Sequence, residues 1–197
     1  GTPLTAKGSI DGFVNGETAT FEVTGEQTEV GKSENTYSLI WDGETVTATE
    51  SDYKLDEDIG ELVVKTNTAE LSVASADGSW TYDGSAHTNK TYTVTFGEET
   101  IEGTEGQVEF KLSTGDKLTI TPAESATITH VAESDVDNAF TWEVENESYY
   151  TKGEDTVGKL TVEPTTLTIV TESDSKEYDG TPLTAKGSID GFVNGET

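Results

Sequence analysis

Two lysines and two asparagines stand out as residues that could form covalent cross-links. Lys7 and Lys90 hold equivalent positions in two related segments of the chain, and so do Asn35 and Asn138. A desolvated, neutral lysine can attack an asparagine carboxamide beside a protonated acid, and burial shifts the pKa values of the lysine and the acid in the required direction. The pattern raises the hypothesis of intramolecular Lys–Asn amide bonds. The alternative is that these lysines are solvated, or keep strand edges from pairing.

Two pairs of aspartates are candidate ligands for calcium. Asp56 and Asp58 lie in one acidic loop, and Asp135 and Asp137 lie in another. Calcium binds about six to eight oxygen ligands, carboxylates among them. Neither loop has the ligand spacing of an EF-hand, so solvated acidic loops are the alternative. Calcium is the only cofactor that the sequence suggests.

Nothing in the sequence marks an enzyme. The chain has no Cys, and its two histidines, His87 and His130, occur in different contexts without a Gly-x-Ser-x-Gly motif. Paired carboxylates carry no information where 39 of 197 residues are acidic, since most must be solvated. We therefore expect no catalytic activity, and the lack of Cys also excludes a disulfide scaffold.

The charge balance disfavours two classes of partner. Asp and Glu number 39 against 11 Lys, with no Arg, and the net charge is −28 at pH 7. Nucleic-acid binding depends on Lys and Arg displacing counterions from phosphates, so we do not expect it here. Anionic lipid is disfavoured for the same reason, and no apolar run approaches the length of a membrane span.

The chain repeats its own beginning. Gly1–Thr18 and Gly180–Thr197 both read GTPLTAKGSIDGFVNGET, so residue 1 recurs at residue 180 and the period is 179 residues. Chance does not produce such an identity. We interpret the chain as a window on a tandem array, in which neighbouring repeats are the first partners.

One period contains two diverged copies of a domain. Ile59–Val64 matches Val157–Val162, and each match closes a domain. One domain is assigned to residues 67–164. The other is split, because residues 1–66 lack its first strand and residues 165–197 supply the opening strands of the next copy. We expect the preceding repeat of an array to donate the missing strand.

Local patterns are almost entirely those of β-strands. Apolar and polar residues alternate in short runs, which is typical of strands with one buried face. The fold class expected is all-β, with tandem Ig-like β-sandwich domains of about seven strands each. A β-grasp-like arrangement with little helix is the alternative. The clearest runs are residues 21–23, 37–41, 92–96, 108–112, 118–120 and 167–169.

Several of these features resemble a known family. Tyr178-Asp179-Gly180-Thr181-Pro182-Leu183 near a domain start, and Tyr53 or Tyr150 followed by Gly-x-Leu-x-Val at a domain end, resemble the MBG-type repeat domains of bacterial cell-surface proteins. The matches cover both domains, hence nearly the whole chain. The resemblance implies extracellular, often wall-anchored, multi-repeat proteins with adhesive or spacer roles and no catalytic residues. The second domain departs from the pattern at Gly84-Ser85-Ala86-His87, where Thr-Pro-Leu would stand.

Together these features predict a structural repeat segment of an extracellular bacterial surface stalk or fibre, cell-wall anchored or fibrous, which spaces a distal adhesive tip from the cell. The joints at residues 65–68 and 163–166 are short and are not Gly/Ser tethers, which favours a stiff array. Two alternatives stay open. The repeats could themselves bind glycans or a host surface, or the chain could self-associate into fibres by strand exchange.

Overall fold

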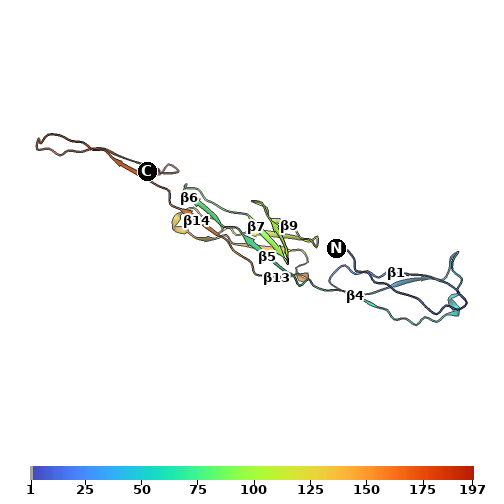
Figure 1. The fold of residues 1–197 in the computed structure, drawn as a ribbon. Helices are drawn as coiled ribbons and strands as arrows, with labels where there is room; N and C mark the ends of the chain where they lie inside the picture. The colour runs from blue at the N-terminus through green and yellow to red at the C-terminus, as the bar shows by residue number, and fades with distance from the viewer. Residues whose placement is uncertain (1) are drawn as a thin grey trace. The chain divides into compact units, whose positions relative to one another are not determined.

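The computed structural model describes residues 2–197, and the chain is all-β. Figure 1 shows short strands joined by extended loops. Helix in the described residues is limited to three turns of 3₁₀ helix, η1 (Glu50–Asp52), η2 (Val131–Glu133) and η3 (Glu147–Tyr149). The predicted all-β class is therefore confirmed. None of the helical turns among residues 2–197 is long and apolar enough to cross a membrane.

The strands fall into three stretches of the sequence. Residues 2–66 contain β1 (Thr20–Val23), β2 (Gly31–Glu34), β3 (Tyr37–Ile40) and β4 (Glu61–Val64). Residues 67–164 contain β5 (Glu70–Ser75), β6 (Gly78–Thr81), β7 (Tyr92–Phe96), β8 (Glu99–Glu102), β9 (Glu109–Lys111), β10 (Lys117–Pro122), β11 (Val136–Asp137), β12 (Phe140–Val144), β13 (Thr151–Lys152) and β14 (Lys159–Glu163). The last stretch contains β15 (Thr168–Thr171) and β16 (Gly187–Asp190).

Contacts divide the chain into two compact units. The first comprises the residues up to Ala69 together with Asn146–Thr151, and the second comprises Glu70–Glu145 together with Lys152–Thr197. The division lies close to the boundary that the sequence places between residues 66 and 67. The C-terminal residues from 165 onward, which the sequence assigns to a further copy, group with the second unit.

In the second unit the beginning of the domain takes part in two sheets. β5 pairs antiparallel with β7, and β7 pairs antiparallel with β8. After Ala76 and Asp77, β6 runs parallel to β14, which also pairs antiparallel with β11. β10 lies between β9 and β12 in a third sheet. Packed sheets form corners where a strand crosses from one sheet to another in this way.

The alternation of side chains along these strands produces a closed core. Leu71 and Val73 on β5 are 0% and 1% exposed, and Leu160 on β14 is 0% exposed. Polar neighbours on the same strands face outward, as the period of two requires. The other buried apolar residues of this unit are Tyr92, Val94, Phe96, Phe110, Leu112, Leu118, Ile120, Ala126, Ile128, Val144 and Val162.

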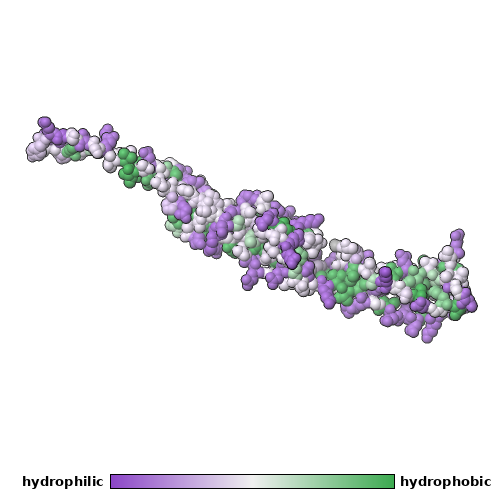
Figure 2. All heavy atoms as spheres, in the orientation of Figure 1, coloured by the Kyte–Doolittle hydropathy of each residue, from purple (hydrophilic) through white to green (hydrophobic). Residues whose placement is uncertain are grey.

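The first unit repeats these pairings with almost no core. β1 pairs with β3 as β10 does with β12, and β2 pairs with β4 as β11 does with β14. Equivalents of β5 and β6 are missing from residues 2–66. In that stretch only Ala48 and Leu62 are buried apolar residues, and Leu55, Ile59 and Val63 are 41–45% exposed. Figure 2 shows apolar surface on this part of the chain, drawn in blue and cyan in Figure 1.

The duplicated sequence adopts two different states. In the C-terminal copy, residues 187–190 form β16 and pair antiparallel with β15. In the N-terminal copy, the same four residues, Gly8–Asp11, form no strand. The sequences are identical, so the presence of β15 as a partner accounts for the difference.

The equivalent residues Leu71 and Leu167 give a matched pair for measuring the core. We expect Leu71→Ala to lower the free energy of unfolding of the second unit by about 2–5 kcal/mol, because Leu71 is fully buried. Leu167 is 41% exposed, so Leu167→Ala should change it by less than about 0.5 kcal/mol. Hydrogen exchange of the β7 amides in dilute protein measures both. Equal effects would contradict this description of the core.

Candidate functional site

The first unit contains an open cleft of about 640 Å³. One wall is Lys7–Asp11, which includes the residues that form a strand only in the C-terminal copy. The opposite wall is Tyr53–Gly60, which leads into β4. The floor consists of Phe13, Phe21, Val23, Asn35, Tyr37, Leu39 and Trp41.

Aromatic rings make up most of the floor. Phe13 meets Tyr53 and Trp41 edge to face, with ring centroids 5.2 and 6.2 Å apart. Trp41 stacks on Tyr53 at 5.9 Å, and Phe21 lies 5.5 Å from Tyr37. The rings support one another, yet the face toward the cleft is uncovered. Such a concave apolar surface favours an occupant that buries it.

Two phenol–carboxylate hydrogen bonds hold the walls of the cleft. The Tyr53 hydroxyl donates to Glu17 Oε2 at 2.5 Å, and the Tyr37 hydroxyl donates to Glu57. Each bond raises the pKa of its phenol, because the neighbouring carboxylate disfavours ionisation. A phenol donates only while it is protonated. The bonds are therefore present below the ordinary tyrosine pKa and are lost as the pH rises through the raised values.

The corresponding place in the second unit is filled by β5. On one side β5 pairs with β7, and on the other it bonds to residues 153–156. The Gly153 and Thr156 amides donate to the Leu71 and Val73 carbonyls at 2.9 and 3.0 Å, and the Ser75 amide donates to Thr156 at 3.0 Å. The two walls of the cleft are therefore the counterparts of the two neighbours of β5.

Two equivalent glycines show that the cleft is open on this side. A Cβ atom on Gly158 would lie 2.5 Å from the Ala76 oxygen and 2.6 Å from the Ser75 oxygen, so only glycine fits there. At Gly60, the nearest atom to such a Cβ is that of Asn35, at 3.9 Å. Gly60 is therefore a glycine although no neighbouring atom in residues 2–66 requires one there.

The predicted pair Asn35 and Asn138 is equivalent in three dimensions. The Asn138 amide N–H donates to Gly158 at 2.8 Å, and the Asn35 amide N–H donates to Gly60 at 2.8 Å. Asn138 is 1% exposed, and its Nδ2 donates to the Ala76 and Asn89 carbonyls, both at 2.8 Å. By contrast, Asn35 Oδ1 is buried without a hydrogen-bond partner.

Ser75 completes the arrangement around Asn138. Its hydroxyl donates to the Asn138 carbonyl at 2.7 Å and accepts from the Gly158 amide at 3.0 Å. Ser75 is 6% exposed, so water has little access to the backbone groups that its hydroxyl bonds. This side chain therefore connects the end of β5 to the start of β12 and to the residue before β14.

The lysines of the cross-link hypothesis lie at the surface. Lys7 lines the same cleft as Asn35 but is exposed. Lys90 is also exposed, and its backbone amide donates to Glu105 at 3.0 Å. The two carbonyl partners of Asn138 explain its burial without a covalent bond. The cross-link stays a prediction, and the mass of the intact chain tests it. Each Lys–Asn bond releases one ammonia, so a mass equal to the sum of the residues would refute it.

The aspartates of the calcium hypothesis lie in different surroundings. Asp56 and Asp58 line the cleft wall. Asp135 and Asp137 lie 3.6 and 2.7 Å from Lys159 Nζ, whose pKa is raised chiefly by the hydrogen bond to Asp137. Among residues 2–197, no three His, Cys, Asp or Glu side chains form a group that could hold a metal. The calcium sites stay predictions from sequence.

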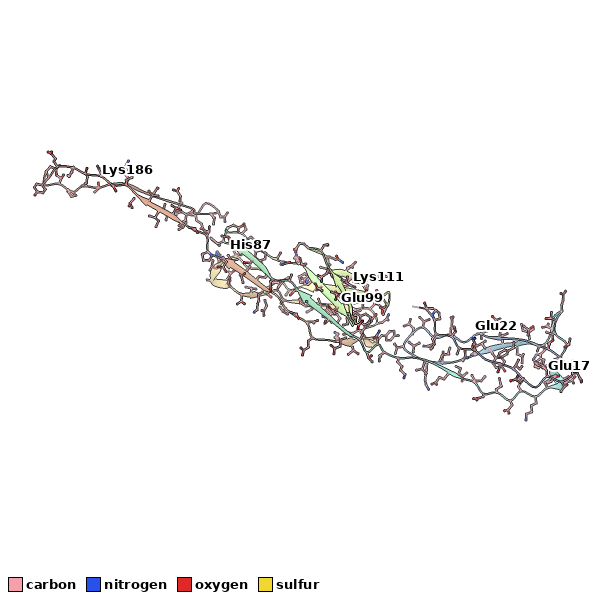
Figure 3. All side chains as sticks on the ribbon, viewed as in Figure 1. Glu17, Glu22, His87, Glu99, Lys111 and Lys186 are labelled. Carbon is pink, nitrogen blue, oxygen red and sulfur yellow. The ribbon has the colours of Figure 1, made fainter. Side chains whose placement is uncertain are left out.

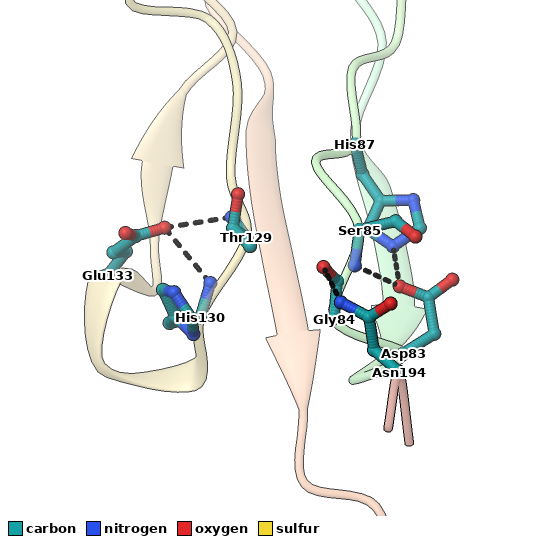
Figure 4. Close-up of polar contacts among 8 residues, drawn as sticks. All are labelled: Asp83, Gly84, Ser85, His87, Thr129, His130, Glu133 and Asn194. Carbon is teal, nitrogen blue, oxygen red and sulfur yellow. Dashed lines mark hydrogen bonds and ion pairs between the residues drawn. The ribbon is translucent and has the colours of Figure 1, made fainter. Parts of the chain in front are cut away.

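The two histidines occupy separate turns, as Figure 4 shows. His87 Nε2 lies 3.0 Å from Asp83 Oδ1, and the His87 ring stacks on Trp80 at 4.9 Å. The pKa of Asp83 is lowered, mainly by the backbone N–H of Ser85. Around His130, the backbone amides of His130 and Thr129 donate to Glu133 and lower its pKa. These contacts stabilise turns.

Comparisons with known proteins return no relative. No protein-family model, no curated protein and no solved structure matches the chain. The site therefore has to be interpreted from its own geometry.

A substitution at Ser75 tests the hydroxyl bridge. We expect Ser75→Ala to lower the free energy of unfolding of the second unit by about 1–3 kcal/mol, because two buried backbone groups lose their partner. Ser79 is exposed on the neighbouring β6, so Ser79→Ala should cost less than about 0.5 kcal/mol. Denaturant unfolding measures both. A Ser75→Ala variant as stable as the control would show that the bridge contributes nothing.

Proposed function

We propose that the chain is a structural repeat segment of an extracellular bacterial surface stalk or fibre. The observation that carries this proposal is the identity of Gly1–Thr18 and Gly180–Thr197. An identical stretch one full period away is what a tandem array produces, and repeat arrays build extended structures from units that contact their neighbours. The resemblance to MBG-type surface repeats agrees with it.

Hydrogen bonds at the joints support a stiff array. Within the second unit, the Tyr82 hydroxyl donates to Glu196 Oε1 at 2.5 Å, and Asn194 Nδ2 donates to the Gly84 carbonyl at 3.4 Å (Figure 4). Asn194 and Glu196 belong to the next copy, so these bonds join one domain to the start of another.

An Ig-like sandwich is the domain architecture that we propose for each complete repeat. Its support is the opening segment, which pairs antiparallel through β5 and then parallel to the last strand through β6. Short strands that alternate buried and exposed side chains agree with two packed sheets. A β-grasp-like arrangement with little helix stays the alternative.

Charge and exposure suit a stalk that stays solvated. The net charge is −28, and Figure 3 shows Glu22 projecting from β1, where it is exposed. Mutual repulsion of like charges keeps neighbouring stalks apart. The same negative charge disfavours binding to nucleic acid or anionic lipid.

Small-angle scattering of chains with one, two and three periods tests the stalk. We expect the maximum dimension to grow linearly with the number of periods, by roughly 60–80 Å each. This is the length of two domains of ordinary compactness placed end to end. The control replaces Glu163–Thr166 with a Gly/Ser linker of equal length. Its dimension should grow more slowly, because flexible chains expand with the square root of their length.

Slow growth in the native chain, equal to that of the linker control, would contradict the stalk. Binding of a native two-domain unit to a glycan array would instead favour the alternative of an adhesive module.

A further inference from the structure

We propose that the cleft in residues 2–66 is an acceptor for a second copy of this chain, and that the occupant is the segment Thr165–Asp179. The inference does not depend on the stalk, since it concerns how one copy completes another. It goes beyond strand donation within an array because it assigns the position of each strand and predicts association between separate chains.

The first part of the segment has a partner strand of known register. β15 pairs with β16 so that Ile169 lies opposite Ile189 and Thr171 lies opposite Gly187. Residues 187–190 are identical to Gly8–Asp11, the wall of the cleft. The same pairing therefore places Ile169 opposite Ile10 and Thr171 opposite Gly8.

The second part of the segment has a free strand edge to occupy. In the second unit β6 runs parallel to β14, with Gly78 opposite Leu160 and Ser79 opposite Thr161. β4 is the counterpart of β14, since both pair in the same register with an equivalent strand. Aligning Tyr178 with Tyr82 then places Asp174 opposite Leu62 and Ser175 opposite Val63.

The occupant would satisfy polar groups that the cleft leaves open. Thr171 is the equivalent of Ser75, so its hydroxyl would reach the Asn35 carbonyl and the Gly60 amide. The backbone carbonyl of Glu172, equivalent to that of Ala76, would accept from Asn35 Nδ2 as the Ala76 carbonyl accepts from Asn138 Nδ2. The close approach of this backbone is also the physical reason for a glycine at position 60.

The occupant would also bury side chains that are now exposed on both partners. Ile169 and Tyr178 are 71% and 98% exposed, whereas their counterpart Val73 is 1% exposed and their counterpart Tyr82 is partly buried against the core. Leu55 and Ile59 on the cleft wall are 45% and 41% exposed. Figure 2 shows apolar surface on the C-terminal hairpin as well.

Sequence identity removes a barrier to exchange. When residues 165–179 enter the cleft of another copy, Gly8–Asp11 there take the place of Gly187–Asp190 beside β15, and the pairing is the same because the residues are the same. The net gain is then the burial of residues 165–179. Each chain has one acceptor and one donor at different places, so the association is head to tail and open-ended.

Sedimentation of the 197-residue chain over a wide concentration range tests the proposal. We expect a monomer in dilute solution and a growing series of oligomers as the concentration rises. Ile169→Asp places a charge in the cleft and should weaken association roughly a hundredfold or more. Val170→Asp adds the same charge on the opposite face of β15 and should change association less than about threefold.

Gly60→Ala tests the acceptor side. The space around Gly60 is open in the monomer, so circular dichroism and hydrogen exchange should be unchanged. Association should fall by about a hundredfold or more, because the new methyl group meets the incoming backbone. A chain that stays monomeric at every concentration, or one whose association neither Ile169→Asp nor Gly60→Ala weakens, would overturn the proposal.

Disulfide trapping tests the register, which is straightforward because the chain has no cysteine. A Val63→Cys chain mixed with a Ser175→Cys chain should form a mixed disulfide under mild oxidation, since the register brings the two positions together. Glu44→Cys, exposed in the turn after β3, replaces Val63→Cys as the control. Equal trapping by both pairs would refute the register.

Discussion

A β-strand at the centre of a domain needs hydrogen-bonding partners on both edges and a buried face, and the completeness of each unit depends on one such strand. β5 has β7 on one edge and residues 153–156 on the other, and it buries Leu71 and Val73. Residues 2–66 contain the counterparts of the neighbours but not of the strand. The cleft and the exposed apolar residues both follow from that one absence.

The duplicated eighteen residues show how far strand formation depends on the segment's own sequence. Gly8–Asp11 and Gly187–Asp190 have the same residues and the same intrinsic propensity, yet only the second forms a strand. Strand formation here is therefore decided by the partner and not by the segment itself, as the strong context dependence of β-propensity implies. Single groups depend on the partner strand in the same way. The Ser75 hydroxyl of β5 bonds to the Asn138 carbonyl, whereas the space beside Gly60, where no such strand lies, is open.

The sequence was sufficient to predict the all-β class, the main alternating runs and the equivalence of Asn35 and Asn138. These follow from a period of two and from self-similarity, which are local properties. The sequence missed the parallel pairing of β6, because Gly78–Thr81 has only one large apolar residue and no alternation to detect. It also missed the cleft, because Lys7–Asp11 and Tyr53–Gly60 are far apart in sequence and meet only through tertiary contacts. For the candidate ligands, the geometry adds that Asp135 and Asp137 share Lys159, a contact that no spacing rule indicates.

The same cleft can be filled from within an array or from another chain, and the effective concentration of the donor decides which is favoured. In the proposed array, residue 179 is bonded directly to the residue that corresponds to Gly1, so the donor is held next to its acceptor and the effective concentration is high. Between separate chains, a donor with Glu172, Asp174, Glu177 and Asp179 approaches a wall with Asp56, Glu57 and Asp58. These like charges repel, and at moderate ionic strength salt screens the charges that lie more than about 10 Å apart. In such an array the tether therefore favours completion within one chain, while the like charges oppose insertion of the donor from either source.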